Sequence, residues 1–374
     1  MNGSGLDHSN GNGNVNDKSI QSDRIIVGGD LRSPLEMIDA YDVNMLTGQA
    51  KNLLRDALVW DAHAGFGPTV EVDLNELSHW TNANVDFLSI NVGFDVIPWE
   101  ETIRNLAAFR HWLEQRPDRF VLVEHTGDIL RAKSEGKLAI AFDLEGACPL
   151  GGQLSMLSLY HRLGVRQMHF VYNLNNEAAG GCHDNDQGLT EFGRSLLKEA
   201  NRLGILVDLS HSGYRTSMEI MEKSIAPVVY SHANPKALSD HPRNITDEQM
   251  RACAATGGLV AVTGIGQFLG DIEASSASFV RAIDMTVERI GVQHVGIGLD
   301  YDFDLQSDDF IAKSPRFWPS EFYSGKFANL RPDQLPEVTE LLLRKGYTET
   351  DIRAILGGNY LRVAEKVWTS MQPI

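Results

Sequence analysis

Four residues with metal-binding side chains stand at or near the ends of separate short apolar runs. His63 ends ALVWDAH, Glu145 lies in LAIAFDLEG, and His211 and His232 end ILVDLSH and PVVYSH. Imidazole nitrogens and carboxylate oxygens are common ligands of Zn²⁺ and similar ions. One histidine in such a place is most often structural, but four ligand-type residues at corresponding places indicate a metal site.

The residues after His63 depart from the pattern expected of a two-ion site. A carboxylate two positions later would add a second ligand, and this chain has Gly65 there. We therefore expect an asymmetric site, with one ion bound by Glu145, His211 and His232 and any ion at His63 bound weakly. Three ligands of these types suffice for a catalytic zinc with an open position.

Two further carboxylates alternate in phase with these ligands. Asp143 precedes Glu145 by two residues and Asp61 precedes His63 by two, so each pair shares one face of its strand. Either aspartate could bind a cation or hold His63 as a hydrogen-bonding partner. The alternative is a buried hydrogen-bond network without metal contact, which the deeper position of Asp143 favours.

Candidate residues for proton transfer and substrate binding follow other apolar runs. Asp300 and Asp302 lie in HVGIGLDYD, and either could serve as a general base. Arg243, in LSDHPRN, could bind a substrate carboxylate through two parallel hydrogen bonds or form a surface salt bridge. His169 is out of phase with Tyr172 in its run, and we treat it as structural.

The elements that would position these residues alternate along the chain. Apolar runs predict eight strands, and amphipathic patterns predict helices between them, one of them opened by a capping box from Thr246 to Gln249. This order predicts a (β/α)8 TIM-type barrel, whose active sites lie at the C-terminal ends of the strands. An open doubly wound sheet is the alternative, but no G-x-G-x-x-G turn follows a strand. The predicted strands are 57–63, 85–93, 138–146, 165–173, 205–211, 227–232, 258–264 and 294–302, and the predicted helices include 98–117, 188–204, 214–224 and 246–257.

The composition limits the function classes. The chain has 374 residues with 33 basic and 50 acidic side chains, a net charge of −17, which disfavours nucleic acid and anionic membranes as partners. Three cysteines far apart do not suggest a disulfide framework and favour a reducing, cytoplasmic location. We expect residues 1–22 to be a disordered leader, residues 23–374 to be one barrel domain, and 303–335 to contain an extended loop.

Several of these motifs, in this order, resemble the membrane (renal) dipeptidase family of the amidohydrolase superfamily. The similarity runs from about Leu58 to Trp368 and is carried by residues 188–262, DLEGA, GIGLDYD and ILGGNYLRVAEKVW. It implies a distorted (β/α)8 barrel, a homodimer, a zinc pair, and hydrolysis of dipeptides, often with a D-residue at the C-terminal position.

The resemblance also assigns roles to residues. Glu145 matches the bridging glutamate, His211 and His232 the histidines of one metal position, and His63 the histidine of the other. Arg243 matches the arginine that binds the substrate carboxylate, and Asp300 and Asp302 match the aspartates of D-[FY]-D-G.

Three positions depart from the family pattern. Gly65 replaces the aspartate of H-x-D, Phe303 replaces the glycine of D-[FY]-D-G, and Tyr172 stands where the family has a substrate-contacting histidine. Tyr172 could donate a hydrogen bond to an oxyanion in place of that histidine. All three departures concern the predicted mouth of the barrel, which points to a changed substrate or reaction.

The function that these residues predict is metal-dependent hydrolysis of a dipeptide or similar small amide. One or two Zn²⁺ would activate a water that attacks the carbonyl, with Asp300 or Asp302 as proton acceptor. A one-metal lyase or decarboxylase acting on a small carboxylated compound is the first alternative. A non-catalytic binding protein is the second, and the retained ligand-type residues argue against it.

Overall fold

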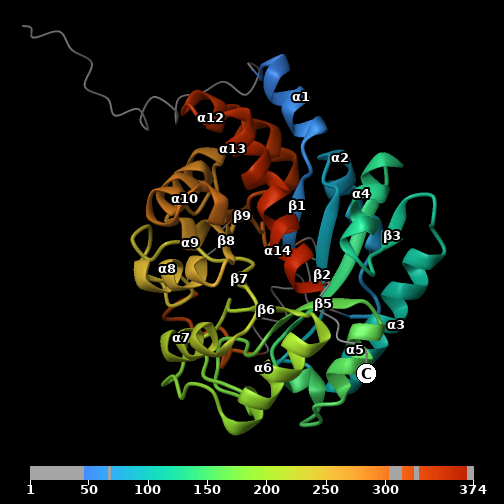
Figure 1. Ribbon diagram of the computed structural model, residues 1–374, viewed down its shortest axis with the longest axis vertical. Helices are drawn as coiled ribbons and strands as arrows, with labels where there is room; N and C mark the ends of the chain where they lie inside the picture. The colour runs from blue at the N-terminus through green and yellow to red at the C-terminus, as the bar shows by residue number, and fades with distance from the viewer. Residues whose placement is uncertain (1–45, 66–68, 303–313, 324–327, 369–374) are drawn as a thin grey trace, which may run out of the picture.

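The computed structural model describes residues 46–65, 69–302, 314–323 and 328–368. Its strands lie within a ring of helices (Figure 1). The predicted leader, residues 1–22, and Phe303 lie outside the described residues. The strands are β1 Trp60–Ala64, β2 Phe87–Phe94, β3 Phe120–Leu122, β4 Leu138–Glu145, β5 Val165–His169, β6 Leu206–Asp208, β7 Val228–Tyr230, β8 Leu259–Val262 and β9 Val295–Ile297. The α-helices are α1 Gly48–Asp56, α2 Ser78–Asn82, α3 Trp99–Glu114, α4 Thr126–Ser134, α5 Met156–Arg162, α6 Glu191–Leu203, α7 Tyr214–Lys223, α8 Asp247–Ala255, α9 Gly266–Leu269, α10 Ser276–Ile290, α12 Leu335–Arg344, α13 Glu349–Arg353 and α14 Asn359–Trp368.

Eight of the strands form a nearly closed parallel barrel in the order β1-β2-β4-β5-β6-β7-β8-β9. Each overlaps one of the eight predicted strands, so the predicted TIM-type barrel is confirmed. The backbone N–H of Asp300, just after β9, donates to the carbonyl of His63 in β1 at 3.1 Å. The carboxylate of Asp61 accepts from the N–H of Leu299 at 2.8 Å. These two bonds join the last strand to the first.

One strand was missing from the sequence prediction. β3 pairs in parallel with the start of β4 and lies off the barrel path. Its three residues are too few to show an alternating pattern, and a short apolar run alone does not separate a strand from a buried loop. The predicted helices at 98–117, 188–204, 214–224 and 246–257 correspond to α3, α6, α7 and α8, and Thr246 and Gln249 form the expected capping box.

The end of the barrel at which the strands begin is filled by apolar side chains. Trp60 at the start of β1 stacks on Tyr360 of α14, with ring centroids 5.0 Å apart, and Phe87 at the start of β2 contacts Trp368 of the same helix. Burying these large rings stabilises the barrel through the hydrophobic effect. α14 therefore closes this end, and polar side chains are left to the opposite one.

A register shift in β1 aims His63 into the barrel. Trp60 and Ala62 belong to the inner core, and Ala64 to the outer core between strands and helices. The pairing of β1 with β2 shifts between Asp61 and Ala64, as at a β-bulge, which re-aims side chains. The sequence analysis placed Asp61 and His63 on one face, which is wrong, because Asp61 instead accepts from the indole N–H of Trp80 in α2 at 2.7 Å.

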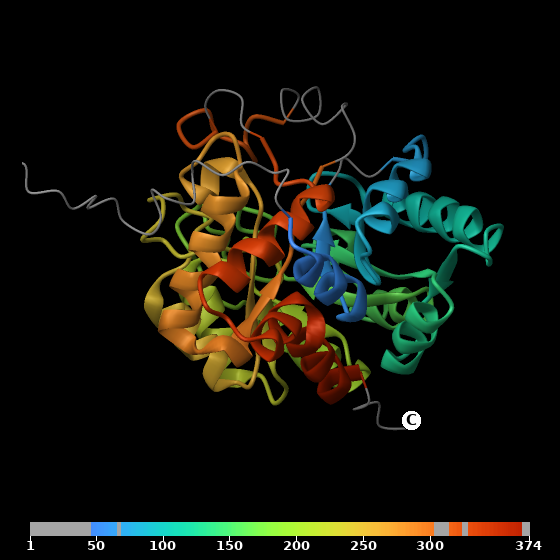
Figure 2. The same cartoon turned by 90° about the horizontal axis from the view of Figure 1, so that it is seen from above.

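Residues 314–323 cross the C-terminal end of the barrel. Asn173, after β5, donates to the carbonyl of Phe317 at 3.0 Å, and His241, after β7, lies 3.2 Å from the carbonyl of Phe322. In Figure 2 this orange-red segment lies beyond the end toward which the blue arrow of β1 points. Part of the predicted loop 303–335 thus reaches the predicted site.

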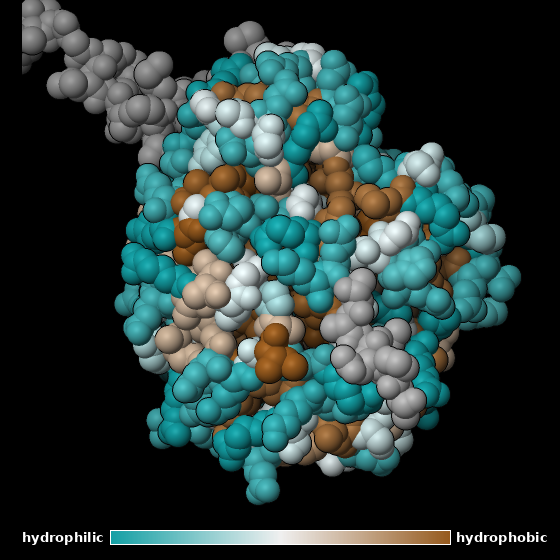
Figure 3. Space-filling model, viewed as in Figure 1, coloured by the Kyte–Doolittle hydropathy of each residue, from teal (hydrophilic) through white to brown (hydrophobic). Residues whose placement is uncertain are grey.

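The visible surface is largely hydrophilic, as expected of a chain with 22% charged residues (Figure 3). Figure 3 shows a face covered mostly by hydrophilic residues. All three cysteines are free thiols, as the sequence predicted. Among the described residues, no helix is both long and apolar enough to span a membrane.

Candidate metal centre and substrate site

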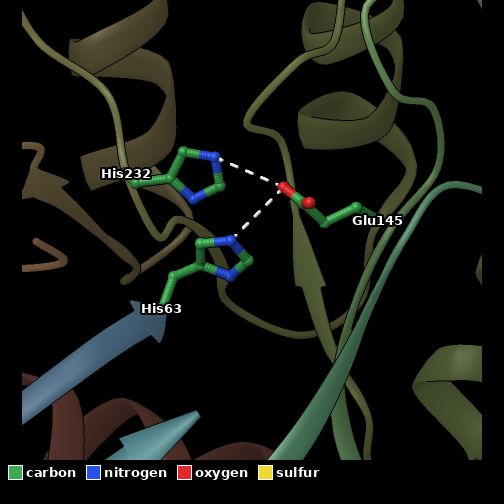
Figure 4. Close-up of side chains that lie close together, drawn as sticks. All are labelled: His63, Glu145 and His232. Atoms are coloured by element: carbon green, nitrogen blue, oxygen red, sulfur yellow. Dashed lines mark ion pairs between the residues drawn. The ribbon is translucent and has the colours of Figure 1, made fainter. Parts of the chain in front are cut away.

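Three histidines converge on one carboxylate oxygen at the C-terminal end of the barrel. His63 in β1, His211 beyond β6 and His232 beyond β7 place their Nε2 atoms 3.4, 3.0 and 3.6 Å from Oε1 of Glu145, the last residue of β4. Figure 4 shows His63 and His232 directed at that oxygen. The four residues predicted as metal ligands therefore lie together and are buried.

The donor atoms do not separate into the two groups that the sequence analysis described. Donor atoms of His63, Glu145 and His232 lie within 4.8 Å of one another. The rings of His63 and His232 are stacked with centroids 4.3 Å apart, and Nε2 of His211 lies 2.9 Å from Nε2 of His232. All four residues surround one small volume.

The Nδ1 atoms show that this donor set fits a metal ion. The Nδ1 atom of His63 lies 3.3 Å from an oxygen of Asp143. The Nδ1 atom of His211 lies 2.7 Å from Oδ1 of Asn173, and that of His232 lies 2.8 Å from Oγ of Ser231. A proton on Nδ1 leaves the Nε2 lone pair free for a cation. In the described part of the chain, the buried Nε2 of His63 has no hydrogen-bond partner.

The electrostatics of the cluster also suit a cation. Burial, together with the positive charge of Arg243, lowers the pKa of His211 well below its usual value, so this imidazole is neutral as a metal ligand must be. Burial favours neutral His63 too, but the carboxylates of Asp143 and Glu145 outweigh it and raise its pKa well above the usual value. Burial raises the pKa of Glu145 to about 7. Positive charge beside His63 and Glu145 is therefore favourable.

His169 forms the floor of the site, a position that the sequence analysis missed. This last residue of β5 is buried, with Nδ1 3.0 Å from the carbonyl of Leu144 and Nε2 3.1 Å from Asp208. Its ring lies edge-on to His63 and His211 at 5.8 and 5.7 Å between centroids. Strand alternation could have revealed this position of His169. Gln167, two residues earlier in β5, faces the barrel interior, where it bonds to Tyr360, so His169 faces inward as well.

Three residues of the site adopt a left-handed backbone that is uncommon outside glycine. Asn173, His211 and Asp300 have φ of 60°, 68° and 54°. Such conformations cost roughly 1–3 kcal/mol each for bulky residues and cluster at functional sites. They turn the chain sharply after β5, β6 and β9 and direct these side chains into the barrel mouth.

Asp300 occupies the space that a side chain at position 65 would need. Its Oδ1 lies 3.7 Å from Nε2 of His63, and a Cβ built on Gly65 would lie 2.5 Å from the same oxygen. Burial raises the pKa of Asp300. Asp302 is half-buried two residues on, and the intervening Tyr301 lies against His79 and Trp80.

Tyr172 lies directly beside the histidine cluster. Its ring stacks on His211 with centroids 4.2 Å apart, and its other neighbours are the rings of Phe94, Phe317 and Trp318. Burial and the negative charge of Glu145 raise its pKa well above the usual value, so the phenol keeps its proton and can donate a hydrogen bond.

Arg243 lies beside His232 of the cluster and is only 3% exposed. Its Nη2 is 3.4 Å from the carbonyl of His232, and its guanidinium is 5.5 Å from the ring centre of Phe268. Across the described ranges no acidic side chain pairs with it. A buried guanidinium without a carboxylate is costly unless a ligand supplies one.

Comparison with known proteins identifies the family to which this chain belongs. Residues 23–308 match the model of the membrane dipeptidase family, peptidase family M19. The chain belongs to the membrane dipeptidase family. Dipeptidase tcpJ of Claviceps purpurea (strain 20.1) is 27% identical over 276 residues, which are 71% of this chain and 60% of that protein. This member of the family thus spans about 60% of the length of that relative.

Solved structures agree with the membrane dipeptidase assignment. An amidohydrolase from Pseudomonas aeruginosa is 29% identical, with a TM-score of 0.79 over 86% of this chain and 99% of its own. A metallo peptidase from Rhodobacter sphaeroides, liganded with a phosphinate mimic of the dipeptide L-Ala-D-Ala, is 22% identical, with a TM-score of 0.68 over 84% of this chain and 100% of its own. The second likeness shows a shared barrel fold.

Proposed function

We propose that this chain is a zinc-dependent hydrolase of a dipeptide, or of a similarly small amide with a free carboxylate. The observation that carries the proposal is the guanidinium of Arg243, which is buried beside the three histidines and Glu145 and pairs with no acidic side chain among the described residues. Arginine binds a carboxylate through two parallel hydrogen bonds, which fixes both the position and the orientation of the substrate.

The residues around the cluster have the properties that amide hydrolysis requires. A divalent ion bound there would supply Lewis-acid activation of water and of the carbonyl. Asp300 faces Nε2 of His63 and would accept the proton of the attacking water at Oδ1. Tyr172 stays protonated and would donate its phenol proton in a hydrogen bond to the developing oxyanion.

The relatives support the same chemistry. The family model is that of a dipeptidase, tcpJ is named a dipeptidase, and the Rhodobacter sphaeroides peptidase holds a mimic of L-Ala-D-Ala. Family membership favours hydrolysis over the lyase or decarboxylase alternative. The homodimer and the cytoplasmic location stay predictions.

We further propose that one Zn²⁺ dominates the site. The three candidate histidines all face one oxygen of the fourth candidate ligand, Glu145, and Gly65 offers no carboxylate for a second ion. Three imidazoles and one carboxylate provide four donors, the usual number around Zn²⁺.

A metal count combined with a substrate panel tests the proposal. We expect about one Zn²⁺ per purified chain, and hydrolysis of L,L- or L,D-dipeptides that falls sharply when the C-terminal carboxylate is amidated. His211→Ala should lose both the metal and the activity. Metal and turnover retained in that variant would contradict the proposal, and about two Zn²⁺ per chain would contradict the single-ion site.

Arg243 gives a more specific test. In Arg243→Met, kcat/KM for dipeptides should fall by about 10²-fold or more, since removing one partner of a buried charge pair costs about 2–5 kcal/mol. Amidated dipeptides, which lack the charge, should lose much less. Arg243→Lys serves as the matched control, because it keeps the charge but not the two parallel hydrogen bonds. Equal losses for both substrate forms would rule out carboxylate binding by Arg243.

A further inference from the structure

Asp143 is a buried carboxylate next to the metal centre that the proposed reaction does not use. It lies in β4 two residues before Glu145 and has no solvent exposure. One oxygen accepts from Oγ of Ser89 at 2.6 Å and lies 3.3 Å from Nδ1 of His63. The other accepts from Nδ2 of Asn91 at 3.4 Å.

These contacts determine which nitrogen of His63 carries the proton. Both oxygens of Asp143 act as acceptors toward Ser89 and Asn91. Nδ1 of His63 therefore faces an acceptor and is the protonated nitrogen. Nε2 then presents its lone pair to the volume beside Glu145. We propose that Asp143 is a positioning residue, which holds His63 as the Nδ1–H tautomer with Nε2 aimed at the cation.

His63 needs this support more than the other two histidines do. Asn173 and Ser231 hold His211 and His232 through neutral groups, whereas His63 faces a carboxylate. A carboxylate at Nδ1 raises the basicity of the ligand nitrogen. Because Gly65 supplies no ligand next to His63, stronger binding through His63 itself compensates for the missing carboxylate.

Asp61 of β1, a second buried aspartate, provides the control. It is a buried aspartate two residues before His63, and its carboxylate accepts from the indole of Trp80 and from the N–H of Leu299. Its contact with His63 is to the backbone N–H and not to the imidazole. An asparagine there has only one acceptor oxygen for these two donors. Asp61→Asn should therefore lower the melting temperature without changing how His63 presents Nε2.

The test is the Zn²⁺ affinity of the metal-free full chain, measured by competition with a chromophoric chelator. Asp143→Ala should bind Zn²⁺ about 10–100-fold more weakly. Asp143→Asn, the conservative variant, should bind with a smaller loss, since Asn91 has an unpaired Oδ1 that can accept from the new amide. Asp61→Asn should keep the wild-type affinity. Dipeptide turnover is not measured, so failure of the proposed function would leave this test intact, although the inference requires that the site bind a cation.

A second measurement reports the tautomer in the metal-free chain, at a pH high enough for the His63 imidazole to be neutral. Nitrogen-15 NMR of the histidine rings should show His63 with its proton on Nδ1 in the wild type, identified by loss of its signals in His63→Ala. In Asp143→Ala, which removes the acceptor at Nδ1, the Nε2–H form should appear, whereas Asp143→Asn, whose Oδ1 can still accept from Nδ1, should keep mostly the Nδ1–H form. Zn²⁺ affinity within about threefold of wild type in Asp143→Ala, or a loss in Asp143→Asn as large as that in Asp143→Ala, would overturn the proposal. An equal loss of affinity in Asp61→Asn would also overturn it, because general destabilisation would then explain both.

Discussion

Tyr172 shows how one aromatic side chain can serve both packing and chemistry. Its ring stacks on His211 and so restricts the rotation of an imidazole that is a candidate metal ligand. Its phenol, kept protonated by burial and by the charge of Glu145, is the donor available to an oxyanion. The stacking needs only the ring, whereas the proposed catalytic role needs the hydroxyl group.

The variant Tyr172→Phe separates these two contributions. It keeps the stacked ring and removes the donor, so we expect kcat to fall by about 10²-fold, a usual result of losing one oxyanion donor. KM and zinc content should change little. Steady-state kinetics on a dipeptide and a metal assay check this, and an unchanged kcat would remove Tyr172 from the reaction.

Glycine is needed at position 65 because Asp300 leaves no room for a side chain, and not because the backbone there has a positive φ. A Cβ at position 65 would approach Oδ1 of Asp300 to 2.5 Å, so Asp300 would have to move away from His63. We therefore expect Gly65→Ala to lower kcat/KM by about tenfold or more, because small displacements of a catalytic group are costly. Gly65→Asp should not create a more active two-zinc enzyme.

Gly48 offers the control for this substitution. A Cβ on Gly48, at the start of α1, would meet no atom within 4 Å, so Gly48→Ala should leave kinetics unchanged. Assays of both variants at equal zinc loading check the comparison. Higher activity in Gly65→Asp than in the wild type would show that Asp300 can give way.

Some residues of the site are positioned by strands and others by the turns that follow the strands. β4 delivers Glu145 as its last residue, but β6 and β7 stop before His211 and His232. Left-handed residues at positions 211 and 300 then bend the chain toward the barrel axis. The predicted strands 205–211 and 227–232 were too long for this reason, because apolar periodicity does not show where hydrogen-bonded pairing stops.

Helices α1 and α12 are joined by a buried carboxylate. Glu340 of α12 accepts from the N–H and the hydroxyl of Thr47, which caps α1, and from Arg344. Burial alone would raise the pKa of Glu340, but these hydrogen bonds outweigh it and hold the pKa below the usual value. The charged form is therefore the one that stabilises this contact.

This shift makes the contact sensitive to acid. A carboxyl group with a lowered folded-state pKa stabilises the protein fully above its unfolded pKa, about 4.5, and loses that stabilisation as pH falls through the folded value. At pH 7, Glu340→Gln should lower the free energy of unfolding by about 1.5 kcal/mol, and the difference from wild type should shrink below pH 4.

Denaturant unfolding at several pH values checks the acid dependence of the α1–α12 contact. The control is Glu349→Gln, because Glu349 also faces α1 through Gln49 but is exposed and should matter little. A wild-type advantage that persists unchanged at pH 3 would show that hydrogen bonding, and not charge, stabilises the contact.

The molecule as a whole places its apolar and polar groups at opposite ends of the barrel. Rings from β1, β2 and α14 fill the end where the strands begin, and the histidine cluster fills the other. A cation there would bind residues within β1 and β4 and just after β6 and β7, far apart along the chain. Such an ion acts as a cross-link of the folded state.

Removing the metal should therefore lower the melting temperature. A ligand at about 1,000 times its Kd stabilises the folded state by about 4 kcal/mol. A melting temperature measured with excess Zn²⁺ should exceed that measured after chelation, by several degrees. The difference should vanish in His211→Ala, and an equal difference in that variant would place the stabilising ion elsewhere.

The primary structure was enough to predict the eight barrel strands, the four clustered metal-binding candidates and Arg243. These predictions rest on local signals, namely apolar runs, helical periodicity and residue types, together with the rule that parallel barrel strands end on one face. Three side-chain positions were decided only by the closed barrel, because no local sequence signal specifies them. The shift in β1 separates Asp61 from His63, Asp300 fills the space beside Gly65, and His169 turns inward. Each depends on the register between strands distant in sequence, which packing sets when the barrel closes.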